Sequence, residues 1–588
     1  MKGLVSQSRR RVMTCLSLIL ALGLASGGPA RHVLAGAAPE LLSHLTNPGE
    51  GWTAFRPAPD TLIVYVSSSE GNDANDGLSA ERPRKSISDG FDLVRNEHSD
   101  WLLLKRGDVW YESIGGITAG RLKNGRSPEQ PTLIASYGAE GDRPLLKLGD
   151  AGTGLGVGVN QPLSVSNLAL VGIHFYDEKG DPGSPEFVRD RDKHGAGVSW
   201  LAPGENLLIE DCHFEYVSAG GIQGRSPSRG APEDVLANVR VRRCVADHAW
   251  NTSGHCQGFF FANIDGLLLE ENVLDHNGYC IETDDLPTWF NHNVYITITC
   301  DNVVARGNIV ARGSTTGIYC RTNGILEDNL CLDNSPSLNL GRISKFRPGG
   351  VTGRIAGNVV IDALSRQSVR QGDVGGGPGI EVGNANFQGV VVENNIVIGS
   401  GAEHPAAFGL SSGGVGLHNV TVRDNISYGW PGFIGWIGEP GTELEKLNLS
   451  GNVVRDNVFQ LHDPQAEARW AVRTRDTADA SGFTFSDNTY YYAPEAKDCV
   501  QLMDEQRVTL EQWLILSRDK GGRVQEVEFV EPTRNDASWH ATLGREATRE
   551  AFLAEACRQG KFNWRPEYTA AAVIKYIREG FRPKDAAN

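Results

Sequence analysis

The stretch GVVVENNIVI, residues 389–398, decides the fold because its pattern recurs through the middle of the chain. A Gly or Asn precedes a short run rich in Val, Ile and Leu, and an Asn and further apolar residues follow. Other copies are GLLLEENVL (266–274), NVVARGNIV (302–310), NGILEDNLCL (323–332), TGRIAGNVVI (352–361), NVTVRDNIS (419–427), GNVVRDNVF (451–459) and GFTFSDNTY (482–490). Short β-runs broken by Asn and Gly, recurring about every 20–40 residues, are typical of a solenoid of stacked β-coils.

The repeated Asn defines a column of equivalent positions. Two earlier copies, NLLIEDCHF (206–214) and NVRVRRCVA (238–246), carry Cys at this position. The column consists of Cys212, Cys244, Asn272, Asn308, Asn329, Asn358, Asn395, Asn425, Asn457 and Asn488. Because stacked Asn side chains can bond turn backbone and one another, we expect the column to be structural. Cys212 and Cys244 would lie on neighbouring coils, where both a disulfide bond and simple packing are open.

Composition and the first residues indicate where the protein works. The chain of 588 residues has a formal net charge of −16, which argues against general nucleic-acid binding. Residues 1–37 resemble a signal peptide: basic residues precede an apolar run and small residues. The arginines at 9–11 are compatible with a twin-arginine signal or with an ordinary secretory signal. No later stretch reaches the ~18 apolar residues of a transmembrane segment, so we expect an exported, periplasmic or extracellular bacterial protein.

Three regions follow the signal. Residues 60–132 contain a strand, a polar turn, a helix near 86–95 and a further strand, which predict an N-terminal cap and first coils. The β-helix itself is expected over 133–492. Residues 493–588 contain two segments of helical periodicity, near 545–559 and 568–581. Because an open solenoid end exposes unpaired strand edges, we expect these helices to cover that end.

The repeats and the helical cap together resemble the pectate-lyase-like superfamily of right-handed parallel β-helices. The resemblance implies an all-β solenoid with an N-terminal helical cap and C-terminal helices. Members include polysaccharide lyases, uronate epimerases, glycoside hydrolases and non-catalytic surface proteins, so the fold alone does not give the activity. It also implies a polysaccharide ligand on the outward face of one parallel sheet.

Alternation along the strands predicts which side chains lie on that face. If Ile222, Ile281, Ile318 and Ile380 point inward, the polar residues that alternate with them in each strand point outward. These outward residues are Gln223, Arg225, Glu282, Asp284, Tyr319, Arg321 and Glu381. We therefore predict that Glu282 and Asp284 lie beside Tyr319 and Arg321 on the next coil.

This wall suits chemistry on a uronate, whose C5 proton is abstracted once its carboxylate is neutralised. Arg321 and Tyr319 are the candidate catalytic residues, and Glu282, Asp284 and Asp285 are candidate ligands for calcium. Gln223, Arg225, His255 and Glu381 are candidate substrate-binding residues. The function predicted is β-elimination or epimerisation of an acidic polysaccharide, and a solvated charged surface is the structural alternative.

A second candidate cluster pairs an Asp with a His in two successive coils. Asp247-His248 and Asp275-His276 occupy equivalent positions, and an Asp can orient an imidazole for proton transfer. His248, His276 and Asp275 are therefore further catalytic candidates, although stacked polar residues at a turn are also ordinary in a solenoid.

Two alternatives to a lyase or epimerase stay open. One is a glycoside hydrolase, since SGHCQG (253–258) and ETDD (282–285) echo polygalacturonase motifs. Their order is reversed, and the adjacent Asp284 and Asp285 would point to opposite faces of a strand, which does not suit a separated acid and base. The other alternative is a carbohydrate-binding or surface-structural protein without turnover.

Overall fold

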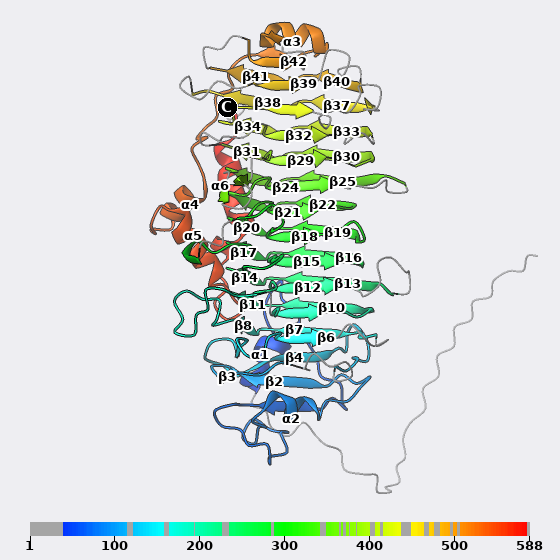
Figure 1. Ribbon diagram of the computed structural model, residues 1–588, viewed down its shortest axis with the longest axis vertical. Helices are drawn as coiled ribbons and strands as arrows, with labels where there is room; N and C mark the ends of the chain where they lie inside the picture. Colours follow the sequence, from blue (N-terminus) through cyan, green and yellow to red (C-terminus); the bar gives the residue numbers. More distant parts are fainter. Residues whose placement is uncertain are drawn as a thin grey trace, which may run out of the picture.

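The computed structural model shows three long sheets wound into a right-handed parallel β-helix (Figure 1). It describes residues 39–114, 122–157, 164–192, 195–225, 234–283, 287–341, 349–363, 366–368, 372–374, 377–383, 385–399, 406–411, 416–436, 449–463, 470–474, 482–493, 498–502 and 506–584. The predicted signal peptide lies outside these residues. Within them, no helix is long and apolar enough to cross a membrane.

Each full coil contributes one strand to each sheet, in the order sheet A, sheet B, sheet C, and neighbouring coils pair in parallel. Sheet A contains β1 (Ile63–Val66), β2 (Trp101–Lys105), β4 (Thr132–Tyr137), β7 (Leu168–Val171), β10 (Gly204–Glu210), β13 (Leu236–Arg242), β16 (Ile264–Glu270), β19 (Asp301–Arg306), β22 (Gly324–Glu327), β25 (Val351–Ala356), β30 (Phe387–Glu393), β33 (Leu417–Arg423), β36 (Leu449–Ser450), β37 (Asn452–Arg455) and β40 (Phe483–Ser486).

Sheet B follows the Asn column in each repeat. It contains β3 (Val109–Trp110), β5 (Leu145–Lys147), β8 (His174–Tyr176), β11 (His213–Glu215), β14 (Val245–Asp247), β17 (Val273–Asp275), β20 (Ile309–Ala311), β23 (Leu330–Leu332), β26 (Val359–Ile361), β31 (Ile396–Ile398), β34 (Ile426–Tyr428), β38 (Val458–Leu461), β41 (Thr489–Tyr492) and β44 (Arg523–Val524).

Sheet C closes the coil. It contains β6 (Leu155–Val157), β9 (Val198–Trp200), β12 (Ile222–Arg225), β15 (Phe259–Ala262), β18 (Val294–Ile296), β21 (Ile318–Cys320), β24 (Leu338–Gly341), β29 (Ile380–Gly383), β32 (Phe408–Ser411), β35 (Ile434–Trp436), β39 (Val472–Thr474), β42 (Val500–Leu502) and β43 (Arg507–Val508). A separate hairpin pairs β27 (Arg366–Ser368) with β28 (Gly372–Val374).

The Asn column forms the corner between sheets A and B, as the repeat predicted. Each Asn amide donates to the side-chain oxygen of the next, as from Asn308 to Asn329 at 2.8 Å and from Asn329 to Asn358 at 3.0 Å. The residue before each column position has a φ between +49° and +72°, which explains the Asp, Asn and Gly found there at most repeats. The column is therefore a buried hydrogen-bonded ladder that turns the chain through the corner.

Cys212 and Cys244 continue this corner as buried free thiols, and no disulfide joins them. The Cys212 sulfur approaches the Leu170 carbonyl at 3.8 Å, and the Cys244 sulfur approaches the Ile209 carbonyl at 3.6 Å. Equivalent positions in successive coils direct their side chains the same way, whereas a disulfide needs the two Cβ vectors to converge.

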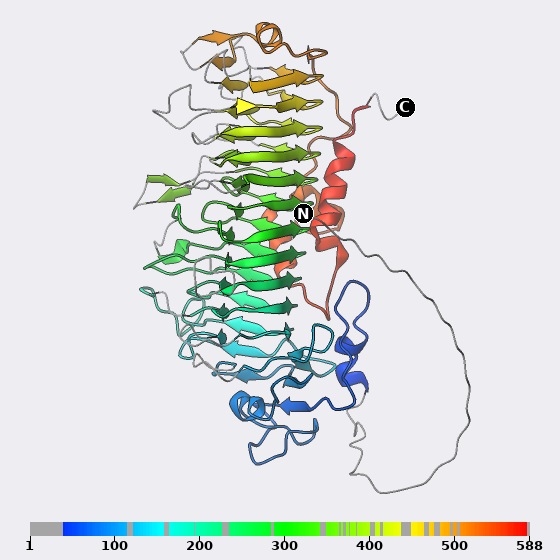
Figure 2. The same cartoon turned by 90° about the vertical axis from the view of Figure 1, so that its right-hand side faces the viewer.

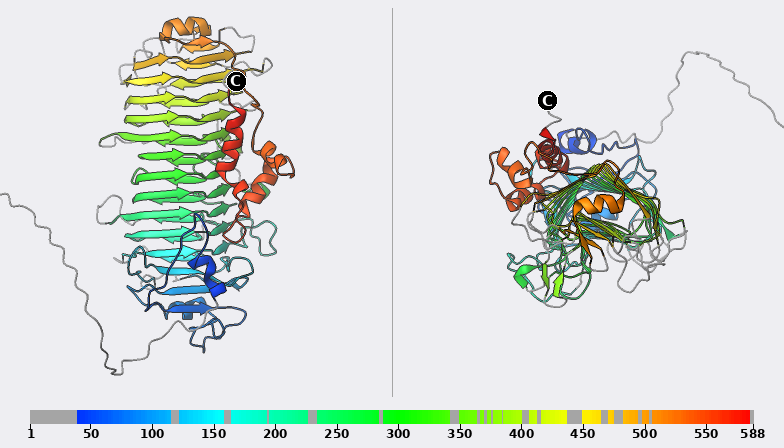
Figure 3. Two further views of the ribbon diagram at one scale, coloured as in Figure 1. Left: turned by 180° about the vertical axis from the view of Figure 1, so that it is seen from behind. Right: turned by 90° about the horizontal axis from the view of Figure 1, so that it is seen from above.

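Helices cover both ends of the solenoid. At the N-terminal end, α2 (Ile87–Phe91) buries Ile87 and Phe91 against the first coil. At the other end, α3 (Leu510–Ser517) places Trp513 in the same core (Figures 1 and 3). Thr509 begins α3 with a reciprocal capping box to Gln512.

The two helices predicted to cover that end lie elsewhere. The helices α4 (Asp536–Thr542), α5 (Arg549–Cys557) and α6 (Ala570–Gly580), with the 3₁₀ turn η5 (Pro566–Tyr568), run back along the outside of sheet B (Figure 2). Phe552 and Ile577 are fully buried against sheet-B residues such as Val273 and Ile309. The prediction was wrong because the outer face of sheet B is apolar here and packs against α5 and α6, while α3 covers the end.

The N-terminal segment and the C-terminal segment contact each other on the outside of the solenoid. The first helix, α1 (Pro39–Thr46), lies beside sheet A, and its His44 ring is 4.9 Å from the ring of Phe562. Farther along, the rings of Trp52 and Trp564 meet edge-on, and the Arg243 guanidinium lies beside both, 4.4 and 4.6 Å from their centres. These contacts fix both tails to the corner between sheets A and B.

Candidate functional site

The outer face of sheet C carries a row of aromatic and polar side chains at its middle. Register pairs Gln223 with Phe260, Phe260 with Tyr295, Tyr295 with Tyr319, Tyr319 with Asn339 and Asn339 with Glu381. The residues beside them, including Ile222, Ile318 and Ile380, are buried in the core. The strand alternation that places Gln223, Tyr319 and Glu381 outward is therefore present in the structure.

The prediction was wrong for the coil that contains Ile281. Residues 281–283 form a 3₁₀ turn, η2 (Ile281–Thr283), in which Ile281 is 61% exposed and Glu282 is also exposed. The sheet-C strand of this coil is β18, thirteen residues after Ile281, where Val294 and Ile296 point inward. The polar residues and Pro287 that follow Ile281 do not suit a buried parallel strand, whereas the sequence Val-Tyr-Ile does.

The predicted neighbours of Tyr319 change accordingly. Tyr295, not Glu282, lies beside Tyr319 in the preceding strand. The Glu282 carboxylate accepts a 3.3 Å bond from the Cys280 thiol. Asp284 and Asp285, the other predicted calcium ligands, lie outside the described residues. The described structure thus does not bring the proposed acidic ligands and Tyr319 together on one strand face.

Tyr295 and Tyr319 form an aromatic surface with the residues around them. Their rings are stacked, with centres 5.2 Å apart and planes 15° from parallel. Phe260 meets Tyr295 edge-on at 5.5 Å, and His292 meets both tyrosines edge-on, at 5.3 and 4.8 Å. The rings therefore support one another as a rigid surface on the outside of the sheet.

Arg321 joins this aromatic surface at the end of β21. Its Nη1 donates a 2.8 Å hydrogen bond to the Tyr295 hydroxyl, and its guanidinium lies 5.6 Å from the centre of the Tyr319 ring. Arg321 is partly exposed. A positive group thus lies beside two phenols, where it can stabilise negative charge on a hydroxyl or on a ligand.

The next two strands add an amide and a carboxylate. The buried Asn339 amide donates to Glu381 Oε2 at 2.6 Å, and the Glu381 side chain is partly exposed. Gln223, three strands before Tyr319, donates to the backbone carbonyl of Ala219. Arg225 follows it at the exposed end of β12.

A loop before β18 adds exposed aromatic rings. Trp289 is 39% exposed and Phe290 is 55% exposed. The exposed His255 ring meets Phe290 edge-on at 5.4 Å, and Gln257 donates to the Phe290 carbonyl at 2.8 Å. The Gln257 side chain also accepts a 2.6 Å bond from the backbone N–H of His292, which connects this loop to the aromatic surface.

Sequence reasoning missed Tyr295, His292, Phe260, Asn339 and the two exposed aromatic residues. The signal for Tyr295 was present, because Val294, Tyr295 and Ile296 alternate as a half-buried strand does. The prediction assigned residues 279–285 as the strand of that coil, so residues 294–296 were not considered for it.

The Asp-His pairs lie at the ends of β14 and β17, on the outside of the corner between sheets B and C. The rings of His248 and His276 are stacked with centres 4.9 Å apart, as their equivalent positions predicted. His248 Nδ1 is 3.1 Å from Asp247, and His213 Nε2 is 2.7 Å from the other oxygen of Asp247. Asp275 differs, because it accepts two bonds from Arg312, at 2.9 and 2.5 Å.

These contacts shift the pKa values of Asp247 and His248 in opposite directions. Burial raises the pKa of Asp247, but the charges and hydrogen bonds of His213 and His248 outweigh it and hold the pKa below its ordinary value. Burial lowers the pKa of His248, but its bond to Asp247 outweighs this and raises the pKa. Asp247 is thus held by two imidazoles and Asp275 by Arg312, which favours a structural role for both carboxylates.

Two hollows elsewhere in the described structure do not coincide with these residues. One, of about 390 Å³, lies beside α6 and is lined in part by Lys575, Arg578 and Arg582. The other, of about 250 Å³, lies over the outside of sheet A near Leu207.

No protein-family model matches this chain, and no curated protein matches it in sequence. Among solved structures, it is similar to a GH136 lacto-N-biosidase from Eubacterium ramulus, with 15% identity and a TM-score of 0.33 over 73% of this chain and 64% of that one. This chain thus spans less than two thirds of that protein. A rhamnogalacturonan lyase matches with 12% identity and a TM-score of 0.36, over 66% of this chain and 87% of that one. XylC in complex with xylose matches with 8% identity and a TM-score of 0.40, over 81% and 88%. These likenesses are too distant to transfer any site residue to this chain.

Proposed function

We propose that this chain is an exported β-helix protein that binds an acidic polysaccharide along the outer face of sheet C and acts on it by β-elimination or epimerisation. The observation that carries the proposal is the stacked pair Tyr295 and Tyr319 with Arg321 beside both. Aromatic rings bind the apolar faces of sugars, and a guanidinium matches the planar carboxylate of a uronate. Export is supported by the basic and apolar pattern of residues 1–37.

The same residues suit proton transfer next to a carboxylate. Arg321 would bind the uronate carboxylate, which makes the C5 proton more acidic. Tyr319, or Tyr295 bonded to Arg321, would act as the phenolate and accept this proton. The C4–O bond then breaks and the resulting phenol returns the proton to the leaving oxygen, which gives an unsaturated uronate. Protonation of C5 by water from the opposite face gives the epimer instead.

A glycoside hydrolase on this surface is less well supported. Hydrolysis uses two carboxylates on either side of the scissile bond. Among the described outward-facing residues of the sheet-C strands from β9 to β29, Glu381 is the only carboxylate. In the lyase or epimerase reaction, a calcium ion bound by Glu282, Asp284 and Asp285 would be an alternative to Arg321 for neutralising the uronate carboxylate.

The test incubates the full chain with acidic polymers, such as polygalacturonate and alginate, and with neutral glucans, with added calcium or with chelator. We expect ultraviolet absorbance from an unsaturated uronate, or a changed uronate NMR spectrum, with acidic polymers only. The double variant Tyr295→Phe/Tyr319→Phe should lower the rate at least about 100-fold, as loss of a general base does, and Arg321→Ala should lower it by removing the partner of the uronate carboxylate. The control is Arg354→Ala, since Arg354 is partly exposed on sheet A. Full activity of Arg321→Ala would contradict the proposal.

A further inference from the structure

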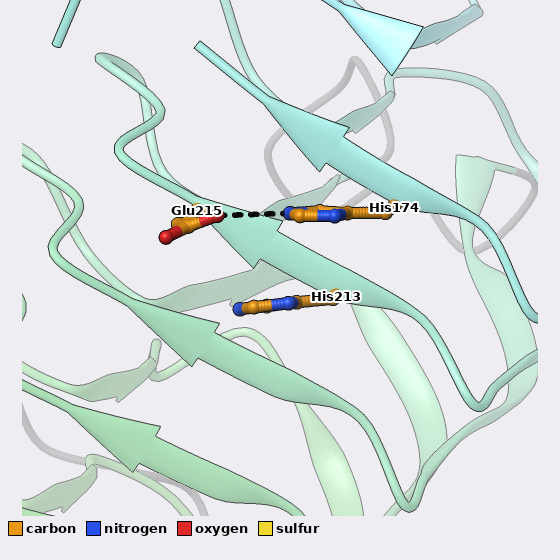
Figure 4. Close-up of side chains that lie close together, drawn as sticks. All are labelled: His174, His213 and Glu215. Carbon is orange, nitrogen blue, oxygen red and sulfur yellow. Dashed lines mark hydrogen bonds and ion pairs between the residues drawn. The ribbon is translucent and has the colours of Figure 1, made fainter. Parts of the chain in front are cut away.

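A second cluster of polar side chains lies on the outer face of sheet B, on the early strands β8 and β11. Phe175 and Phe214 point into the core and are fully buried. The alternating residues His174, His213 and Glu215 are therefore turned outward, where all three are partly exposed. Figure 4 shows both imidazoles projecting to the same side of the sheet, with the Glu215 carboxylate at the tip of His174.

The three side chains converge because strand register places them together. His174 pairs directly with His213, and their rings lie 4.3 Å apart and 8° from parallel. His174 Nε2 is 3.0 Å from Glu215 Oε2. One donor atom from each residue lies within 4.8 Å of the other two. Two nitrogens and a carboxylate oxygen thus face one small volume.

A second carboxylate adjoins this group from the next strand. Asp247 Oδ1 is 2.7 Å from His213 Nε2, and the Asp247 side chain is only 9% exposed. Arg143, whose charge acts on His174, is paired with Asp211 at 2.6 Å. Two neutral imidazoles and two carboxylates would balance the charge of one divalent cation.

We propose that His174, His213 and Glu215 bind a divalent transition-metal ion of the zinc type. Two imidazoles and one carboxylate are donors preferred by such ions, whereas calcium and magnesium prefer oxygen ligands alone. Zinc–ligand bonds are about 2.0–2.2 Å long, so the donors must approach to about 3–3.5 Å of one another. His174 and Glu215 already meet this spacing, and the stacked rings need only tilt their Nε2 atoms together.

The number of protein ligands and the position of Asp247 indicate how the metal would be coordinated. Three protein ligands on a partly exposed surface leave one position for water. Asp247 contacts the same His213 nitrogen that would bind the metal, so the metal would replace this hydrogen bond, and the Asp247 carboxylate would then lie beside the cation and stabilise it by its charge. The site lies on sheet B and uses none of the residues proposed to act on polysaccharide on sheet C, so the two proposals stand or fall separately.

The test uses the full chain after treatment with chelator and dialysis. Calorimetric titration with Zn²⁺ should show one site, and Co²⁺ should give the visible absorption bands of a low-symmetry nitrogen and oxygen site. His174→Ala and Glu215→Gln should lose this binding, and Asp247→Asn should weaken it about 10- to 100-fold. His418→Ala is the matched control, because His418 lies on sheet A and contacts Ser450 at 2.7 Å.

Two results would overturn the proposal. One is a metal-free wild type that takes up neither ion. The other is a Glu215→Gln protein that binds Zn²⁺ as tightly as the wild type does. Glu215→Gln keeps the size and shape of the side chain, so it separates ligand loss from misfolding if His174→Ala is unstable. Melting temperatures without metal check the fold of each variant, and only the wild type and the control should gain stability when Zn²⁺ is added.

Discussion

At the scale of the residue, the repeated Asn side chains stabilise the solenoid through a buried ladder of hydrogen bonds. Asn329 is fully buried, accepts from the backbone N–H and the amide of Asn308, and donates to the Ala305 carbonyl at 2.9 Å. Asn329→Ala leaves these groups without partners in a site that excludes water. Each orphaned group costs about 1–3 kcal/mol, so a clear loss of folding free energy is expected.

Denaturant unfolding of the variant, followed by circular dichroism, measures this loss. Asn323→Ala is the control, because its side chain bonds Asp301 and the Thr352 N–H in a more exposed position. Equal unfolding midpoints for Asn329→Ala and the wild type would show that the column is not structural.

The sequence predicted Gln223, Tyr319 and Glu381 on the sheet-C surface but missed Phe260, Tyr295 and Asn339. Tyr319 lies eleven residues after Asn308 and could be placed by counting from the Asn corner. Tyr295 could not, because an insertion separates it from Asn272 and contains a competing apolar residue, Ile281. Alternation fixes which face a residue takes, but it does not say where an interrupted strand resumes.

At the scale of the element, α5 and α6 cover the apolar outside of sheet B. Phe552 is fully buried between this sheet and Tyr568, whose ring is 5.9 Å away. Phe552→Ala would leave a cavity and should destabilise the protein by about 3–5 kcal/mol. Thermal unfolding measures the change, and Ile515→Ala, at a 77% exposed position of α3, is the control. A variant as stable as the wild type would mean that these helices dock only weakly.

The docking of α1 should depend on pH through His44. Burial, together with the positive charges of Lys561 and Arg106, lowers the pKa of His44 from 6.5 to about 4. Between these two values the unfolded chain binds more protons than the folded one, so stability falls as the pH falls. The contribution of a neutral His44 is complete above about pH 6.5 and is lost on the way to pH 4.

His44→Gln tests this dependence because glutamine does not titrate. The stability of the wild type relative to the variant should decrease as the pH is lowered from 6.5 to 4, as measured by chemical unfolding at each pH. Other groups titrate in both proteins and cancel in the comparison. Parallel pH profiles of the two proteins would refute the assignment.

At the scale of the whole molecule, the N-terminal and C-terminal helices lie against different faces of the solenoid. The C-terminal helices lie along sheet B and α1 lies beside sheet A (Figures 2 and 3). The middle of sheet C carries the Tyr295–Tyr319 surface, Arg321 and the exposed Trp289 and Phe290. The repeat predicted the solenoid and its corners, but nothing in the helical periodicity of residues 545–581 indicated which face those helices cover.

The central claim is that this surface of sheet C binds an acidic polysaccharide through Arg321 and its two tyrosines. The most direct measurement is calorimetric titration of the full chain with oligogalacturonate and with a neutral glucan oligomer of equal length. We predict binding of the acidic oligomer alone, at least about tenfold weaker in Arg321→Ala, since a charged hydrogen bond contributes about 1.5–3 kcal/mol. Arg354→Ala should bind as the wild type does. Equal affinity of Arg321→Ala and the wild type for the acidic oligomer would contradict the claim.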